Sequence, residues 1–215
     1  MSSDDGLKKS TTLASWGRRF EIGLEEVSTA YRASVQALEQ HSADAEQLTR
    51  RRFGLEPDDP IPEDETDGLP FSDFFWEQVG EFDREAAGAL EIVRTAFLIG
   101  LFHFWERQSR RWVDTKHYEH ERVMKWLREH GQEPDEDALK DLQQAANCAK
   151  HGSGCSCMKL YKRRPHLFSS CEDEDASRSF EPNDETLQIT AEKLDEFFEA
   201  VRASGPKAPR LWGNV

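Results

Sequence analysis

The chain has 215 residues, of which 37% are hydrophobic and 33% are charged, and its formal net charge is -14. This length fits one domain, and the acidic balance argues against broad, non-specific binding of nucleic-acid backbones, so DNA is not an expected partner. Four cysteines are too few, in a chain of this size, to indicate a fold held together by disulfides. We expect them to be reduced thiols or part of a metal site.

The N-terminal sequence MSSDDGLKKS is polar and lacks the apolar core of a signal peptide. The longest apolar run, Ala96–Trp105, is too short to span a bilayer and contains His103. We therefore expect a cytoplasmic protein that does not enter a membrane.

Residues 1–9 are expected to be disordered, and a long N-terminal helix is expected over residues 10–53. The apolar residues of this helix recur at steps of three and four, as in an amphipathic helix, and they are Leu13, Trp16, Phe20, Leu24, Val27, Tyr31, Val35 and Leu38. Residues 54–70 are rich in proline, glycine, aspartate and glutamate, which predicts an acidic surface loop.

Residues 71–203 are predicted to form a helical bundle, and a C-terminal tail follows over residues 204–215. The segment from Phe71 to about Val113 contains no proline, which favours one or two long helices at the centre of the bundle. The expected buried side of this segment comprises Leu90, Val93, Phe97, Leu98, Leu101 and Phe104.

A shorter helix is expected over residues 117–129, ended by Gly131, and the next helix begins with Asp135 as its cap. Thr190 is the expected cap of the last helix, and a short extended segment precedes it. The predicted fold class is therefore all-α, a helical bundle of five or six helices with a short extended segment before the last one.

The candidate catalytic residues lie at the end of the helix that Asp135 caps. Asn147 and His151 are four residues apart, which places them on one face of a helix, and Lys150 is adjacent. A histidine at a helix end can act as a general acid or base near neutral pH, and a lysine can stabilise the charge of a phosphate. An asparagine one turn earlier can orient the histidine or bind a phosphate or ribose oxygen. Metal-independent cleavage of RNA needs groups of these kinds.

The residues from 147 to 168 contain no aspartate or glutamate but five basic residues, Lys150, Lys159, Lys162, Arg163 and Arg164. In so acidic a chain this segment predicts a local basic site that binds RNA. The expected RNA-binding residues are Lys159, Lys162, Arg163 and Arg164, together with Arg110. The alternative is a helix C-terminus that favours cations, followed by a solvated basic loop.

This combination resembles the HEPN superfamily, the higher eukaryotes and prokaryotes nucleotide-binding domain, whose members carry Arg, a polar residue and His at a helix end. The matching stretch is Ala146-Asn147-Cys148-Ala149-Lys150-His151, followed by Gly152. The segment Phe97–Arg110 is similar to the apolar, aromatic helix with a glutamate that several bacterial members have. The order of elements over residues 151–203 also matches, so the resemblance covers residues 72–203.

The resemblance implies a metal-independent endoribonuclease of a bacterial antiphage defence or toxin system, without a cofactor, acting as a homodimer or with an operon-encoded partner protein. It makes His151 the acid/base, with Lys150 stabilising the phosphate and Asn147 and Glu106 orienting. The alternative for Glu106 is an exposed helix face on which it pairs with Arg110, four residues later. The arginine of the motif is replaced by Ala146, and Lys150 or Arg110 is the substitute cation. An inactive helical dimerisation or regulatory subunit is the alternative.

A competing interpretation uses the sulfur atoms. Cys148, His151, Cys155 and Cys157 could supply four zinc ligands, although their spacing is not a standard zinc pattern. In that zinc-stabilised interaction domain His151 would be a ligand and could not transfer protons, so the two interpretations exclude each other.

Overall fold

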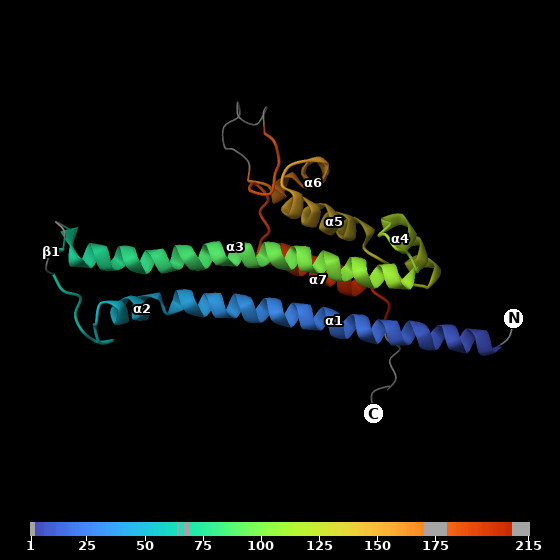
Figure 1. Cartoon of the computed structure of the whole chain (residues 1–215), viewed down its shortest axis with the longest axis horizontal. Helices are drawn as coiled ribbons and strands as arrows, with labels where there is room; N and C mark the ends of the chain where they lie inside the picture. Colours follow the sequence, from blue (N-terminus) through green and yellow to red (C-terminus); the bar gives the residue numbers. More distant parts are fainter. Residues whose placement is uncertain (1–2, 64, 67–68, 170–179, 208–215) are drawn as a thin grey trace. The chain divides into compact units, whose positions relative to one another are not determined.

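The computed structural model describes residues 3–63, 65–66, 69–169 and 180–207, and the side chains of residues 15–63, 70–169 and 180–207. These residues form an all-α fold (Figure 1) with seven α-helices and one 3₁₀ helix. The α-helices are α1 (Ser3–Ala43), α2 (Ala45–Arg52), α3 (Phe71–Trp112), α4 (His120–Glu129), α5 (Glu136–His151), α6 (Cys155–Arg163) and α7 (Ala191–Ser204). The 3₁₀ helix is η1 (Pro165–Leu167), and β1 (Glu65–Thr66) pairs with β2 (Leu69–Pro70).

The helix count exceeds the five or six predicted, because α2 and α6 are short helices that the periodicity did not separate from their surroundings. Helix α1 begins at Ser3, before the expected start at Ser10. The segment from Phe71 is one continuous helix, and the predicted 54–70 loop contains the two-residue strands β1 and β2.

The chain divides into two compact units, and both α1 and α3 contribute to each. The second unit, Ala30–Val93, has an aromatic centre at the end of α2. The ring of Phe53 lies 5.3 Å from that of Phe71 and 5.7 Å from that of Phe74, measured between centroids. Phe75 is fully buried, and the guanidinium of Arg50 lies over its ring.

The first unit, Met1–Thr29 with Arg94–Val215, has its core where the early part of α1 meets the end of α3. The ring of Phe20 packs edge-on against Trp105 and Trp112, and all three side chains are buried. Of the apolar side predicted for α3, Leu98, Leu101 and Phe104 are buried, whereas Leu90, Val93 and Phe97 are only half-buried.

Helix α3 also contains, among the described residues, an 18-residue window that is long and apolar enough to cross a membrane. The core helix of a soluble protein passes the same test, so this composition is weak evidence for a membrane span. Of the window, 22% is buried, and other apolar residues of α3, such as Leu90 and Phe97, are half-buried.

The helix caps predicted for α5 and α7 are confirmed. The carboxylate of Asp135 accepts from the amide of Ala138 at 3.0 Å, and the hydroxyl of Thr190 accepts from the amide of Lys193 at 3.2 Å. The end of α7 is tied to the start of α5, because the hydroxyl of buried Ser204 accepts from the amide of Asp135 at 2.9 Å.

Where an extended segment is predicted before α7, the chain has one isolated bridge residue, Leu187, which pairs with Phe168. The amide of Gln188 donates to the carbonyl of Leu167 at 2.7 Å, and the amide of Ser169 donates to the carbonyl of Thr186 at 2.8 Å. This bridge holds the segment before α7 beside the residues that follow η1.

A polar chain connects α3 to α4. The indole of Trp105 donates to the hydroxyl of Tyr118 at 3.2 Å, and that hydroxyl lies 3.1 Å from Nδ1 of His120. Burial raises the pKa of Tyr118 to about 12. Burial is also the largest cause that lowers the pKa of His120, and Lys140 and Arg163 lower it further. A neutral imidazole suits this position, because its Nδ1 can accept a hydrogen bond from the tyrosine hydroxyl.

We predict that His120 makes the fold sensitive to acid. Because its pKa is lowered in the folded state, the unfolded chain binds more protons, so the free energy of unfolding falls as pH drops below the ordinary histidine value. Urea unfolding at a series of pH values, compared with His120→Gln, measures this contribution. The difference between the two proteins should shrink towards low pH, and parallel curves would contradict the prediction.

Candidate α5–α6 phosphate-binding corner

Helices α5 and α6 pack against each other and form a helical hairpin joined by residues 152–154. Helix α5 stops at His151 because Gly152 has a φ of 74°, and Gly154 before α6 has a φ of 137°. Both values lie in the region that glycine adopts without a steric penalty. The GSG sequence therefore makes a tight turn between two helices, and the expected solvated basic loop is instead largely helical.

The hairpin is closed at the turn by a disulfide between Cys148 and Cys157, with a Cα–Cα distance of 4.8 Å. Both residues are buried, at 0% and 1% exposure. The expectation of reduced thiols is therefore wrong for this pair, and the interpretation as zinc ligands loses two of its thiolates because a disulfide sulfur carries no negative charge. No cluster of metal-ligating side chains occurs in the described part of the chain, where Cys155 is an exposed free thiol.

The opposite end of the hairpin is held by a buried carboxylate. The side chain of Asp141 is 1% exposed and accepts from Nε of Arg163 at 2.8 Å and from Nε of Arg164 at 2.7 Å. Arg163 also pairs with exposed Asp137 at 2.9 Å, which lowers the pKa of that carboxyl and raises the pKa of the guanidinium. Two of the five predicted RNA-binding cations therefore serve in an internal clamp.

The three residues singled out on α5 lie at the turn end of the hairpin. Lys150 and His151 are exposed, and Asn147 is half-buried one turn earlier. Among the described residues, none of the three has a hydrogen bond or ion pair to another side chain. Their donors and acceptors are therefore available to a ligand.

The first turn of α6 adds backbone donors beside Lys150 and His151. Gly154 precedes this helix, and no side chain caps its amides. We call Lys150, His151, Gly152–Gly154 and the first turn of α6 the α5–α6 corner. It combines an exposed cation, a titratable imidazole and uncapped amides, a set that suits an anion such as a phosphate.

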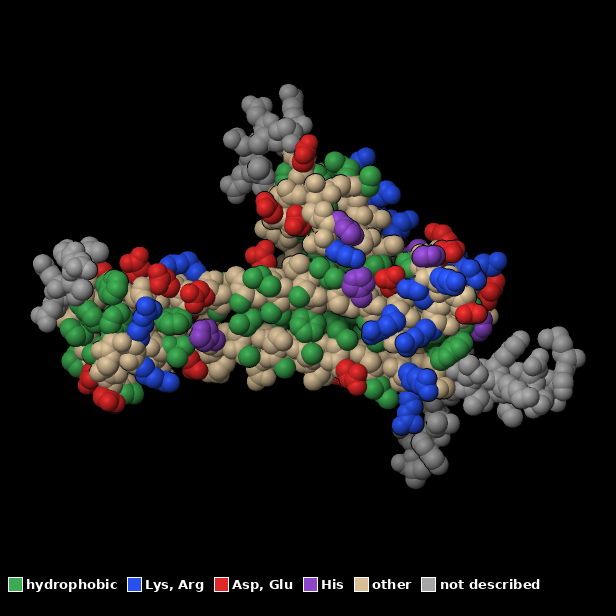
Figure 2. Space-filling model, in the orientation of Figure 1, with side chains coloured by type: hydrophobic (Ala, Val, Ile, Leu, Met, Phe, Trp, Pro, Cys, Tyr) green, Lys and Arg blue, Asp and Glu red, His purple; other side chains and the backbone are tan. Residues whose placement is uncertain are grey.

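The solvent face of α6 continues the basic character of the corner. Lys159 and Lys162 are exposed, and no ion pair to either is present in the described part of the chain. Figure 2 shows lysine and arginine side chains along the surface formed by α5 and α6. Three of the five basic residues in the segment 147–168 are thus free to contact an anion, and they are Lys150, Lys159 and Lys162.

Glu106 and Arg110 lie on α3 and pair with their own helix. The carboxylate of Glu106 lies 3.3 Å from Nδ1 of His103 and 3.9 Å from Nη1 of Arg110. No contact from Glu106 to Asn147 or His151 is found among the described residues. The structure therefore does not bring the predicted supporting carboxylate together with the histidine.

The position of the missing motif arginine is in the core. Ala146 is only 2% exposed, and it faces the side of α5 that also buries Leu142 and Ala145. A cation at this position would have to leave the core to reach the corner. Lys150, which is exposed on the last turn of α5, is the basic residue of that helix nearest in sequence to His151.

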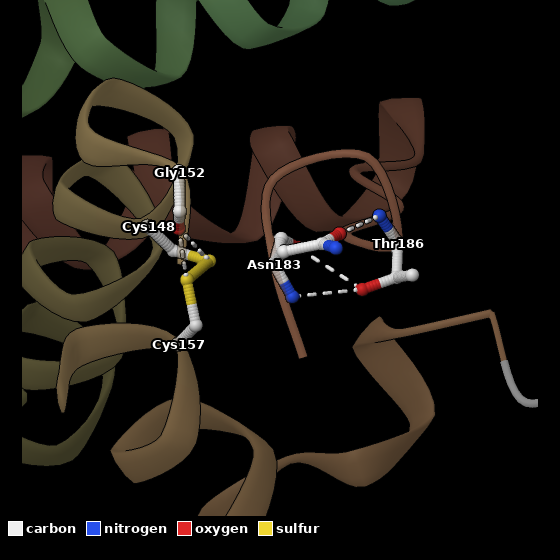
Figure 3. The surroundings of a disulfide bond; sticks show 5 residues. All are labelled: Cys148, Gly152, Cys157, Asn183 and Thr186. Carbon is white, nitrogen blue, oxygen red and sulfur yellow. Dashed lines mark hydrogen bonds between the residues drawn. A yellow bond between two sulfur atoms is a disulfide. The ribbon is translucent and has the colours of Figure 1, made fainter. Parts of the chain in front are cut away.

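Asp184 and the turn around it were not anticipated. The carboxylate of Asp184 lies beside Gly152, where a Cβ added to the glycine would meet its Oδ1 at 3.4 Å. Figure 3 shows the turn from Asn183 to Thr186 next to the disulfide, closed by mutual hydrogen bonds of 2.9 and 3.0 Å between these two residues. The sequence Asn-Asp-Glu-Thr is a typical turn signal, but its place beside the corner depends on the fold.

No protein-family model, curated protein or solved structure matches this chain.

Proposed function

We propose that this chain is a HEPN-like protein of a bacterial antiphage defence or toxin system that binds RNA phosphates at the α5–α6 corner. The observation that carries the proposal is the exposed pair Lys150 and His151 beside the uncapped first turn of α6. The proposal concerns a local site, because the whole chain has a net charge of -14 and repels an extended nucleic-acid backbone.

The binding chemistry follows from the donors at the corner. Amides at the start of a helix point towards an anion, and the lysine adds a full positive charge. Lys159 and Lys162 on the outer face of α6 extend the same surface for neighbouring phosphates. Asn147, half-buried one turn before His151 on α5, would contact a ribose or phosphate oxygen.

RNA cleavage is the catalytic form of the same proposal. His151 would take the proton of a ribose 2′-hydroxyl, while Lys150 and the amides of α6 stabilise the negative charge that develops on the phosphate. Neither Glu106 nor a motif arginine supports His151 in the described structure. Binding of RNA is therefore the primary proposal. Cleavage would require a partner protein or the RNA itself to supply the group that supports His151.

The test is fluorescence anisotropy with a single-stranded RNA oligonucleotide at several salt concentrations. Lys150→Ala should weaken binding and reduce the slope of log affinity against log salt by about 0.7, the value for one lost phosphate contact on a single strand. Lys125→Ala is the matched control, since Lys125 is 76% exposed on α4, away from the corner in sequence. Equal losses for both variants would contradict a localised site.

The same RNA separates binding from cleavage. Products that appear with the native chain and not with His151→Ala, in the presence of a chelator, would support a metal-independent nuclease. Unchanged RNA with normal binding would leave an RNA-binding module.

A non-catalytic helical dimerisation or regulatory subunit, acting as a homodimer or with an operon-encoded partner, is the second candidate. It is favoured by the internal pairing of Glu106, Arg163 and Arg164, which removes three predicted site residues from RNA. In α3, Trp76 and Ile92 are exposed large hydrophobic residues that a second helical protein could cover. The mass of two chains by light scattering, together with no RNA binding, would favour this candidate.

A further inference from the structure

We infer that the pair Cys148 and Cys157 is a thiol–disulfide exchange site that controls the α5–α6 corner. In the oxidised form the corner is held in the geometry described above, and reduction by a dithiol loosens it and weakens binding of RNA phosphates. The effect on RNA binding rests on the proposed function. The inference that the disulfide keeps the α5–α6 corner ordered does not.

The first argument is the placement of the two connections between α5 and α6. At one end of the hairpin, the carboxylate of Asp141 binds Arg163 and Arg164, and this clamp does not depend on redox state. At the other end, the disulfide joins the helices. Reduction therefore removes the cross-link at the end of α6 that carries the corner, where the Gly152–Gly154 turn still joins the two helices, and leaves the clamp at the far end intact.

The second argument is that the disulfide brackets the candidate residues in sequence. Lys150 and His151 lie between the two cysteines, together with the Gly152–Gly154 turn. A cross-link restricts the conformations of the segment that it closes. Lys150, His151 and the amides at the start of α6 thus belong to one covalently closed segment.

The third argument is the carbonyl of Gly152, which points at the sulfur atoms (Figure 3). Its oxygen lies 2.7 Å from Sγ of Cys157 and 3.9 Å from Sγ of Cys148. A disulfide sulfur has no proton to donate, whereas a thiol does. Reduction therefore replaces the covalent bond with thiols, one of which can donate a hydrogen bond to the carbonyl of Gly152. The change in bonding thus occurs at the first residue of the turn.

The exchange reaction is balanced by the dithiol reductant. One thiolate of the reductant attacks a sulfur of the pair, the Cys148–Cys157 bond breaks, and a mixed disulfide forms. The second thiol of the reductant displaces the cysteine, so the reductant leaves as its own disulfide. The pair gains two electrons and two protons and becomes two thiols. Because both cysteines are buried, attack requires local opening of the glycine turn.

The experiment uses the full chain with Cys155→Ser and Cys171→Ser. Of the four cysteines in the sequence, only Cys148 and Cys157 can then be oxidised or reduced. Air-oxidised and dithiothreitol-reduced protein are compared by RNA anisotropy and by hydrogen exchange of residues 150–157. The reduced form should bind RNA about tenfold more weakly, because one or two groups that the disulfide holds in place must then be ordered on binding. The amides of the turn should exchange faster in the reduced form.

A variant that adds Cys148→Ser and Cys157→Ser should behave as the reduced form in both oxidising and reducing buffer. Serine retains a donor for the Gly152 carbonyl, and the reduced native pair gives the same information if this variant does not fold. Equal hydrogen exchange in the two redox states, or a pair that dithiothreitol cannot reduce in the folded protein, would overturn the inference. If no form binds RNA, the proposed function fails, and the exchange data still decide whether the disulfide controls the corner.

Discussion

Replacement of Asp141 by asparagine is expected to lower the free energy of unfolding by about 2–3 kcal/mol. The carboxylate is 1% exposed and neutralises two guanidinium groups, Arg163 and Arg164, at 2.8 and 2.7 Å. Loss of this carboxylate removes the ion pair of Arg164, whereas Arg163 keeps its pair with Asp137. The expected cost is below that of a fully enclosed pair, because the two arginine side chains are 33% and 39% exposed and keep part of their hydration.

The control for this prediction is Asp137→Asn, which removes the other carboxylate on Arg163. Asp137 is 78% exposed, so its loss should change stability little. Arg163→Met and Arg164→Met, measured singly and together by urea unfolding, show whether the two arginines share the carboxylate. A change of less than about 0.5 kcal/mol for Asp141→Asn, the range of ordinary surface substitutions, would show that the clamp does not hold the hairpin.

The clamp also explains why α6 was not predicted from the sequence. A helix of nine residues is marginal in water on its own, and Gly154 supplies no side-chain cap. Its stability comes from buried Leu160, from the disulfide and from Asp141, which lies 22 residues before Arg163 in the sequence. None of these partners is visible to a local pattern, whereas the caps Asp135 and Thr190 are local and were predicted correctly.

The same distinction between local and distant partners applies to the candidate site. The spacing of Asn147 and His151 and the helix end at Gly152 follow from a few neighbouring residues, so the sequence was sufficient to predict them. The partner of Glu106 depends on how α3 faces the rest of the bundle. Its own helix offered His103 and Arg110 at one-turn spacing, and these neighbours are its partners in the structure.

Asp184 lies outside any local pattern, because its contact with Gly152 depends on the path of the chain after η1. The Phe168–Leu187 bridge returns the chain to the hairpin and brings the turn from Asn183 to Thr186 beside the disulfide. A carboxylate near the corner reduces its positive potential, so the balance between Lys150 and Asp184 bears on the affinity of the corner for an anion.

Substitution of Gly205 by alanine is expected to destabilise the first unit by about 2–3 kcal/mol, the upper part of the range for overpacked cores. Gly205 follows α7 with a φ of -72°, so alanine meets no backbone strain there. The obstacle is steric, because a Cβ at this position would overlap three carbons of the Phe20 ring. Phe20 is 1% exposed and packs against Trp105 and Trp112, so it has little room to move.

The matched control is Gly100→Ala, because Gly100 lies within α3 and nothing surrounds its added Cβ within 4 Å. Alanine is the better helix former, so this variant should gain roughly 0.5–1 kcal/mol while Gly205→Ala loses stability. Phe20→Leu should reduce the cost of Gly205→Ala in a double-mutant cycle, because the smaller side chain frees the space that Cβ needs. Equal effects of Gly205→Ala with Phe20 and with leucine would show that the two residues do not constrain each other. A positive coupling would place the end of α7 directly on the aromatic core, where Ser204 also fixes the start of α5, the helix that carries His151.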